Sequence, residues 1–277
     1  MGVYKEMTIN QFSKRGQVTI FIIIAVVIIA AVILFFTMTQ SGKKIINNLI
    51  GGEIDVNGEL QNCLSTNQKV NDKINLILSQ GGSSDPQNYF SYNNTKVEYL
   101  CYTSEYLKTC YVQRPRLVTY VETEITKAIK QDIQECINSL EQDLRDKNYE
   151  VNSNKLSKLY ANLTPSKIII STDYGLSVKK PGDTTGVRTF ENVKLTKPSK
   201  AYDLIMLATS IINYESAYGN SEILNYMIYY PNVRVEKERF DPGIKVYVLT
   251  NRDTRDQFVF AVKSLAFPPG YEIPKTV

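Results

Sequence analysis

Four cysteines have the most distinctive chemistry in this chain of 277 residues. They are Cys63, Cys101, Cys110 and Cys136, and all follow a long apolar segment near the N-terminus. An even number of cysteines in an exported domain predicts disulfide bonds, with three connectivities open. The alternatives are four free thiols buried as small hydrophobic side chains, or a zinc site. Zinc is the weaker alternative because the chain has neither a C-x-x-C pair nor a His.

A predicted hairpin favours a bond between Cys101 and Cys110. Its strands are expected at residues 96–103 and 108–113. If the tip falls at residues 105–106, the two cysteines lie opposite each other. Cβ atoms of cross-strand neighbours are about 4.5–5.5 Å apart, which is close to the distance that a disulfide needs.

Two predicted amphipathic helices carry the other two cysteines. Apolar residues recur at steps of three and four over residues 58–79 and again over residues 116–147. Cys63 and Cys136 lie on these two apolar stripes. Packing one stripe against the other would bring the cysteines together, so the favoured second bond is Cys63–Cys136.

Catalytic chemistry has little support in the composition. The missing His removes the commonest general base and the usual zinc ligand. The acid pairs Glu122/Glu124 and Glu236/Glu238 could in principle serve glycoside hydrolysis, which needs two carboxylates at a set separation. Charged residues at such spacings are more typical of a solvated face. We therefore expect no catalytic, cofactor or metal site, and the chain is predicted not to be an enzyme.

Two segments match the N-glycosylation sequon, at Asn93 and at Asn162. Pro165 directly follows the second sequon and makes it the less favourable one. Asn93 is therefore the candidate glycosylation site. The alternative is that both segments are ordinary surface loops.

Tyr226, Tyr229 and Tyr230 cluster near the end of a predicted helix. Because aromatic residues are enriched at interface hot spots, they could form a contact surface. The alternative is packing in the core or at its rim.

Residues 18–36 form an apolar run in which Thr19 is the sole polar residue. A helix of this length spans about 28 Å, close to the thickness of a bilayer's hydrocarbon core. No charge occurs between Arg15 and Lys43. We therefore predict a single membrane-spanning helix with the lipid bilayer as its partner. A secretory signal peptide has a shorter apolar run, and a buried core helix is rarely apolar on every face.

The net charge of +4 lies beside this run. The flanking bases are Lys5, Lys14, Arg15, Lys43 and Lys44, and Glu6 is the single acid before residue 53. Without these six residues the chain has 27 basic and 27 acidic side chains, from totals of 32 and 28. A nucleic-acid partner is not expected, since it requires a clustered basic excess. Three bases before the run and two after it favour a cytoplasmic N-terminus, which agrees with disulfides in an outward-facing domain.

Residues 14–24 begin Lys14-Arg15-Gly16-Gln17 and continue into the apolar run. This segment resembles the class III signal peptide of archaeal type IV pilins and archaellins. The resemblance covers residues 14 to about 50. It implies that a membrane-embedded leader peptidase cuts between Gly16 and Gln17. It also implies that the retained helix serves as a membrane anchor or as a filament core, with the C-terminal domain outside the cytoplasm.

One position departs from that family. Its members often carry Glu five residues into the mature chain, where this sequence has Phe21. The departure puts filament assembly in question more than it does processing. The remainder of the chain resembles uncharacterised archaeal surface proteins, a likeness that implies no activity.

The predicted fold class is α+β with mainly antiparallel sheet, because runs of helices and runs of strands do not alternate strictly. The predicted regions are a basic leader (1–16), a transmembrane or pilin-like helix (17–50), a helical region with the disulfide-linked hairpin (53–150) and an α+β region (151–277). The polar stretch 146–157 would divide the last two, which form one domain or two. After it, strands are expected at 166–172, 174–179, 187–195, 232–237, 243–250 and 257–264, and helices at 200–214 and 221–229.

The sequence thus favours a pilin-like, membrane-anchored cell-surface protein with a structural or adhesive role. It would be a filament subunit or minor pilin, with copies of itself or other pilin-like subunits as partners. The alternative is a membrane-tethered binding module that does not polymerise. A third hypothesis is an exported hydrolase that uses carboxylates.

Overall fold

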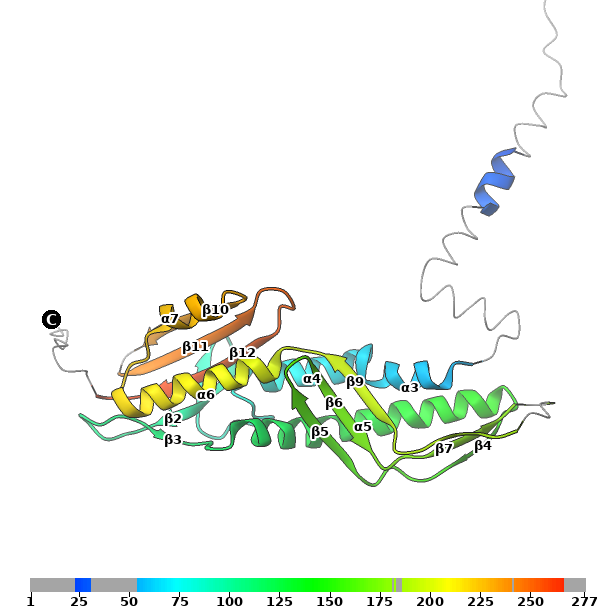
Figure 1. The fold of residues 1–277 in the computed structure, drawn as a ribbon, viewed down its shortest axis with the longest axis horizontal. Coiled ribbons are helices and arrows are strands. Elements are labelled where there is room, and N and C mark those ends of the chain that lie inside the picture. Colours follow the sequence, from blue (N-terminus) through cyan, green and yellow to red (C-terminus); the bar gives the residue numbers. More distant parts are fainter. Residues whose placement is uncertain (1–22, 31–53, 181, 183–185, 241, 267–277) are drawn as a thin grey trace, which may run out of the picture. The chain divides into compact units, whose positions relative to one another are not determined.

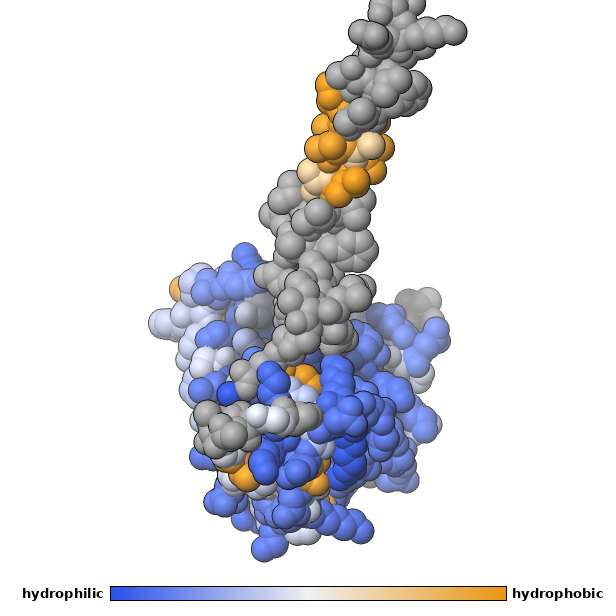
Figure 2. All heavy atoms as spheres, turned by 90° about the vertical axis from the view of Figure 1, so that its right-hand side faces the viewer, coloured by the Kyte–Doolittle hydropathy of each residue, from blue (hydrophilic) through white to orange (hydrophobic). Residues whose placement is uncertain are grey.

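The computed structural model describes residues 23–30, 54–180, 182, 186–240 and 242–266 (Figure 1). The chain forms two compact units, Met1–Val56 and Asn57–Val277. In the first unit residues 23–30 are helical, with every side chain exposed, and Figure 2 shows them as hydrophobic. The rest of the predicted membrane segment lies outside the described residues. Within the described ranges, no helix combines the length and the apolar character needed to cross a membrane.

The described helices of the second part are α3 (Val56–Ser65), α4 (Gln68–Ser79), α5 (Leu117–Asp146), α6 (Ala201–Tyr218) and α7 (Ile223–Tyr229). Helix α5 confirms the predicted helix at 116–147. The prediction of one helix over 58–79 is wrong, because the chain forms α3 and α4 there. Asn67 adopts an extended conformation, and its side chain accepts a hydrogen bond from the backbone N–H of Val70. This N-cap starts a new helix.

The described strands are β1 (Tyr89–Tyr92), β2 (Thr95–Tyr102), β3 (Tyr111–Val112), β4 (Glu150–Ser153), β5 (Leu159–Thr164), β6 (Lys167–Thr172), β7 (Leu176–Lys179), β8 (Arg188–Phe190), β9 (Lys194–Pro198), β10 (Val233–Phe240), β11 (Ile244–Asn251) and β12 (Gln257–Lys263). They form three sheets, in the orders β1-β2-β12-β11-β10 with β3 beside β2, β4-β7-β8, and β5-β6-β9. Every described pairing is antiparallel except β12 with β2. The α+β class with mainly antiparallel sheet is confirmed.

Strands β6 and β7 are neighbours in the sequence but do not pair with each other. Consecutive strands β6 and β7 occupy the predicted positions but belong to different sheets. Between them, the Asp173 carboxylate accepts hydrogen bonds from the backbone N–H groups of Ser157 (3.0 Å) and Lys158 (2.8 Å). These bonds fix the chain where it leaves one sheet for the next.

The predicted strand at 187–195 is also wrong as a single element. It divides into β8 and β9, which lie in different sheets, and Asn192 between them has a positive φ of 50°. That conformation interrupts an extended chain, and Asn tolerates it better than most residues. Strands β1, β4 and β5 have no predicted counterpart, and β4 lies within the stretch expected to divide two regions.

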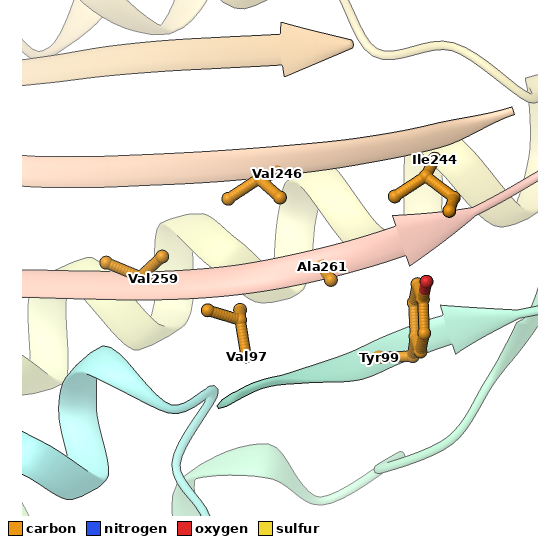
Figure 3. Close-up of a cluster of buried hydrophobic side chains, with 6 residues drawn as sticks. All are labelled: Val97, Tyr99, Ile244, Val246, Val259 and Ala261. Atoms are coloured by element: carbon orange, nitrogen blue, oxygen red, sulfur yellow. The ribbon is translucent and has the colours of Figure 1, made fainter. Parts of the chain in front are cut away.

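The largest sheet curls until its two outer strands touch. The rings of Phe90 on β1 and Phe240 on β10 are 4.8 Å apart, and the Tyr92 hydroxyl donates to the Glu238 carboxylate. The curl encloses an apolar cluster from β2, β11 and β12 (Figure 3): Val97, Tyr99, Ile244, Val246, Val259 and Ala261. Contact between the edge strands therefore protects one face of the sheet without a helix.

The other face of this sheet is covered by helices. Phe258, Phe260 and Tyr247 are fully buried there, and the rings of Tyr247 and Phe260 stack 5.1 Å apart. Helices α4 and α6 pack against β12, while α5 contacts α4, α6, β4 and β5 (Figure 1). Helix α5 thus joins elements from both predicted C-terminal regions, which share the unit Asn57–Val277.

Both favoured disulfides are present. Cys63–Cys136 joins α3 to α5 with Cα atoms 5.7 Å apart, and Cys101–Cys110 lies beside the β2–β3 pairing with Cα atoms 5.3 Å apart. The expected placement of the second pair needs one correction. Cys101 pairs in register with Val112, so Cys110 is its diagonal neighbour and does not lie directly opposite.

A buried ion pair joins α6 to β11. The Glu215 carboxylate is fully buried and accepts hydrogen bonds from Lys245 Nζ, the Tyr247 hydroxyl and the backbone N–H of Ser221. Lys245 also donates to the carbonyl of Gly219. Burial, followed by the negative charge of Glu215, raises the pKa of Tyr247 well above its ordinary value. The C-terminal end of α6 is therefore fixed by charge as well as by packing.

We predict that the double substitution Cys63→Ala/Cys136→Ala lowers the free energy of unfolding by about 4 kcal/mol, because that bond closes the longer loop. The matched change Cys101→Ala/Cys110→Ala should cost about 2.5 kcal/mol on the same loop-entropy model. Guanidinium unfolding of the oxidised proteins measures both values. Equal losses from the two variants would contradict the loop-length explanation.

We predict that Glu215→Ala destabilises the protein by about 3–5 kcal/mol, because it leaves the Lys245 ammonium buried without its counter-charge. Glu236→Ala is the control, since Glu236 pairs with Arg234 at an exposed site and should cost less than about 1 kcal/mol. Urea unfolding compares the two. Recovery of stability in the double variant Glu215→Leu/Lys245→Met would show that the unpaired charge causes the loss.

Candidate functional site

One long segment of the chain is almost free of charge. From Leu204 to Val233 the charged residues are Glu215 and Glu222 alone, although 22% of the whole chain is charged. Glu215 is fully buried in the ion pair. Glu222 is therefore the single exposed charge on most of α6, on α7 and on the loop between them.

The outer face of α6 presents large side chains to solvent. Met206, Ser210, Tyr214 and Tyr218 follow one another at steps of four, so they form one stripe along the helix. The exposed fractions of Met206, Tyr214 and Tyr218 are 46%, 51% and 61%, and the two tyrosine rings lie 5.0 Å apart. The opposite face of α6 is buried against the sheet and α5.

Helix α7 has no buried residue. Leu224, Ile228, Tyr229 and Tyr230 are all more than half exposed, and Tyr229 reaches 79%. A hydrogen bond of 3.1 Å between the hydroxyl groups of Tyr226 and Ser210 places α7 beside the outer stripe of α6. The large exposed side chains of these two helices are uncharged, and we group them as one surface. We call it the α6–α7 surface: Met206, Tyr214, Tyr218, Leu224, Ile228, Tyr229 and Tyr230.

The loop beneath this surface is firmly held. Gly219 ends α6 in the left-handed conformation, with φ 73°. Lys237 Nζ donates to the carbonyl of Ser221 (2.7 Å) and to the side-chain oxygen of Asn220 (3.1 Å), and burial lowers the pKa of Lys237. Glu222 caps α7 by accepting from the backbone N–H of Leu224 (3.2 Å). The loop between α6 and α7 is thus held by hydrogen bonds along its length.

The predicted tyrosine cluster is placed in part as expected. Tyr229 and Tyr230 are exposed, while Tyr226 is half-buried and bonded to Ser210. The sequence reasoning missed the contribution of α6. The signal that could have revealed it is the run of 30 residues with two acids and no base.

The end of the unit farthest from α7 in Figure 1 differs in character. Figure 2 faces this end of the unit, and most of the surface of the unit drawn there is hydrophilic. A hollow of about 460 Å³ lies on the β4-β7-β8 sheet, where Asn152, Ser177 and Thr189 form one row across the strands. Gly175 lines the hollow without a side chain to fill it. The hollow can offer hydrogen bonds to a polar ligand.

The described carboxylates do not form a catalytic pair at the predicted positions. Glu122 accepts from the backbone N–H of Leu163 and Glu124 from that of Ser84, while Glu236 and Glu238 bond to Arg234 and Tyr92. Asp173 borders the hollow, but hydrogen bonds, chiefly from the Ser157 hydroxyl, lower its pKa to about 2. It therefore stays ionised at neutral pH. Among the described residues no cluster of His, Cys, Asp or Glu could hold a metal ion.

The remaining predicted site residues lie apart from the α6–α7 surface in the sequence. Gly16 and Gln17 are outside the described residues. Asn93 is exposed in the tight turn between β1 and β2, with φ 47°. Asn162 is in β5.

Comparison with known proteins gives no relative: no family model matches the chain, no curated protein matches its sequence, and no solved structure matches its fold.

We predict that Asn93 carries a glycan when the protein is made in its own host, because the β1–β2 turn presents its side chain to solvent. Mass spectrometry of Asn93→Gln should show the loss of the glycan mass. Asn162→Gln is the control, since its sequon precedes Pro165 within a paired strand, and its mass should change only by the substitution. An unmodified wild-type peptide containing Asn93 would refute the prediction.

Proposed function

We propose that this chain is a pilin-like, membrane-anchored cell-surface protein whose Asn57–Val277 unit makes protein contacts through the α6–α7 surface. Its role would be structural or adhesive, as a minor pilin or filament subunit. The observation that carries the proposal is the α6–α7 surface itself: a rigid, tyrosine-rich, uncharged surface on a disulfide-bonded unit that follows a long apolar segment.

The character of the α6–α7 surface supports a contact role. Monomeric soluble proteins rarely expose a contiguous apolar patch of more than a few hundred Å². The buried centres of protein interfaces are enriched in Tyr and Met and depleted of Lys, Glu and Asp. The surface matches this composition, with four tyrosines and one methionine among its seven residues.

The two disulfides support an outward-facing unit. Disulfides persist in oxidising compartments and are rare in the cytosol of most organisms. All four cysteines of the chain take part in these bonds. With the apolar run before them, they favour a single-pass anchor that carries this unit outside the cytoplasm.

The Gly16-Gln17 junction supports processing of the pilin type, and Phe21 favours a protein present in few copies over a major filament subunit. Phe21 and the polar hollow also favour the second candidate, a tethered binding module that does not polymerise. The positions of the four acids give no support to an exported hydrolase.

We predict that the mature protein from host membranes begins at Gln17, because the leader peptidase would cut after Gly16. N-terminal sequencing tests this directly. Gly16→Val should leave the leader attached, whereas the control Gly2→Val, at the far end of the leader, should be processed normally. A wild-type chain that begins at Met1 would defeat the pilin-like proposal. Negative-stain microscopy of sheared cells then separates a filament subunit from a tethered module.

A further inference from the structure

We propose that the α6–α7 surface is a homotypic interface, through which two copies of this chain pack against each other about a two-fold axis. The inference rests on the proposed function and deepens it by naming the partner. In a two-fold interface the same patch faces itself on both subunits, so the patch must be complementary to its own copy.

Charge permits a second copy as the partner and disfavours a partner chosen by charge complementarity. Like charges brought together across an interface repel, so a strongly charged patch opposes its own pairing. The α6–α7 surface has no charged member, and Glu222 is the single exposed charge of the segment from Leu204 to Val233. A partner chosen by complementary charge would find nothing on this segment to complement except one carboxylate.

A membrane surface fits less well. Helices that lie on a bilayer combine their apolar face with Lys and Arg that meet anionic headgroups. Between Leu204 and Val233 there is no Lys or Arg. Two bases close to the loop between these helices, Lys237 and Arg239, lie on β10, and Lys237 is already bonded to Ser221 and Asn220.

The area agrees with a stable dimer. The four tyrosines are 51–79% exposed, which amounts to roughly 500 Å² if a full tyrosine presents about 200 Å². With Met206, Leu224 and Ile228 the surface reaches on the order of 800 Å², which is the contribution of one partner to a standard interface.

The alternation of large and small side chains on the outer face of α6 suits packing against the α6 of a second copy. Large residues of the outer face, Met206, Tyr214 and Tyr218, are interspersed with the small exposed residues Ser210 and Ala217. Such relief forms the ridges and grooves by which helices interlock. Because the Glu215–Lys245 ion pair and the Lys237 bonds already fix the α6–α7 loop, little ordering free energy is lost when two copies meet.

Cysteine cross-linking of the full-length chain in detergent tests the proposal. All four native cysteines are in disulfides, so an introduced cysteine supplies the sole free thiol. Tyr214→Cys, Leu224→Cys and Ile228→Cys sample the surface, and Tyr160→Cys, at a 60% exposed tyrosine on β5, is the control. With a flexible bis-maleimide, at least one surface variant should give a covalent dimer and the control should not.

Adding Tyr229→Lys to the cross-linking variant should reduce the dimer at least tenfold, because it places two ammonium groups in the interface. Tyr229 is 79% exposed, so this change should leave the thermal midpoint unaltered. Tyr160→Lys is the matched control. Dimer yields no higher than those of Tyr160→Cys, dimers that survive Tyr229→Lys, or cross-links to a different host protein would each overturn the homotypic interface.

The N-terminal residue of the same preparation tests the proposed function separately. A chain that starts at Gln17 but does not cross-link would reject the homotypic interface alone. A chain that starts at Met1 but still cross-links through α6–α7 would reject the pilin-like proposal and retain the interface.

Discussion

The apolar stripe of α5 is the feature on which the Asn57–Val277 unit depends. Helix α5 has 30 residues and is therefore about 45 Å long, so one element can reach α4, α6, β4 and β5. Its buried positions include Asp132, whose carboxylate pairs with Lys73 of α4 at 2.6 Å. The smaller sheets are short and need this helix as a common core. Because α6 also packs on α5, the outer stripe of α6 is positioned by the same core.

The features set by local sequence could be predicted, and those set by distant partners could not. The period of α5, the last three strands and the Cys101–Cys110 pair follow from spacing within short windows, where side-chain direction repeats regularly. The Cys63–Cys136 pair, 73 residues apart, required in addition that two apolar helix stripes pack together. The choice of sheet for β6 and β7 depends on Asp173 bonding to Ser157 and Lys158, sixteen and fifteen residues earlier. The break at Asn67 did have a local signal, an N-cap residue, but the apolar stripe continues across it and conceals it.

The candidate site shows the same division. Tyr229 and Tyr230 were recognisable as aromatic residues near a helix end, whereas their continuity with Tyr214 and Tyr218 depends on the Ser210–Tyr226 contact between two helices. An uncharged outer face is also unusual for a helix, since exposed faces normally carry the charges. Here the one acid within α6 after its first turn, Glu215, points inward to Lys245. The Glu215 charge therefore anchors the C-terminal end of α6, and the outer face beyond the first turn carries no charge.

The bond between Cys63 and Cys136 has a mechanical consequence. Tension applied through the N-terminal end of the chain enters this unit at α3 and meets the disulfide eight residues after position 55. Beyond that point the load passes covalently into the middle of α5. The chain between the two cysteines, 73 residues apart, cannot extend under this tension because the disulfide bridges it. Pulling can therefore unfold only the start of α3 before it must displace α5, the longest described helix. Residues 64–135 are therefore shielded from such tension as long as the disulfide is intact.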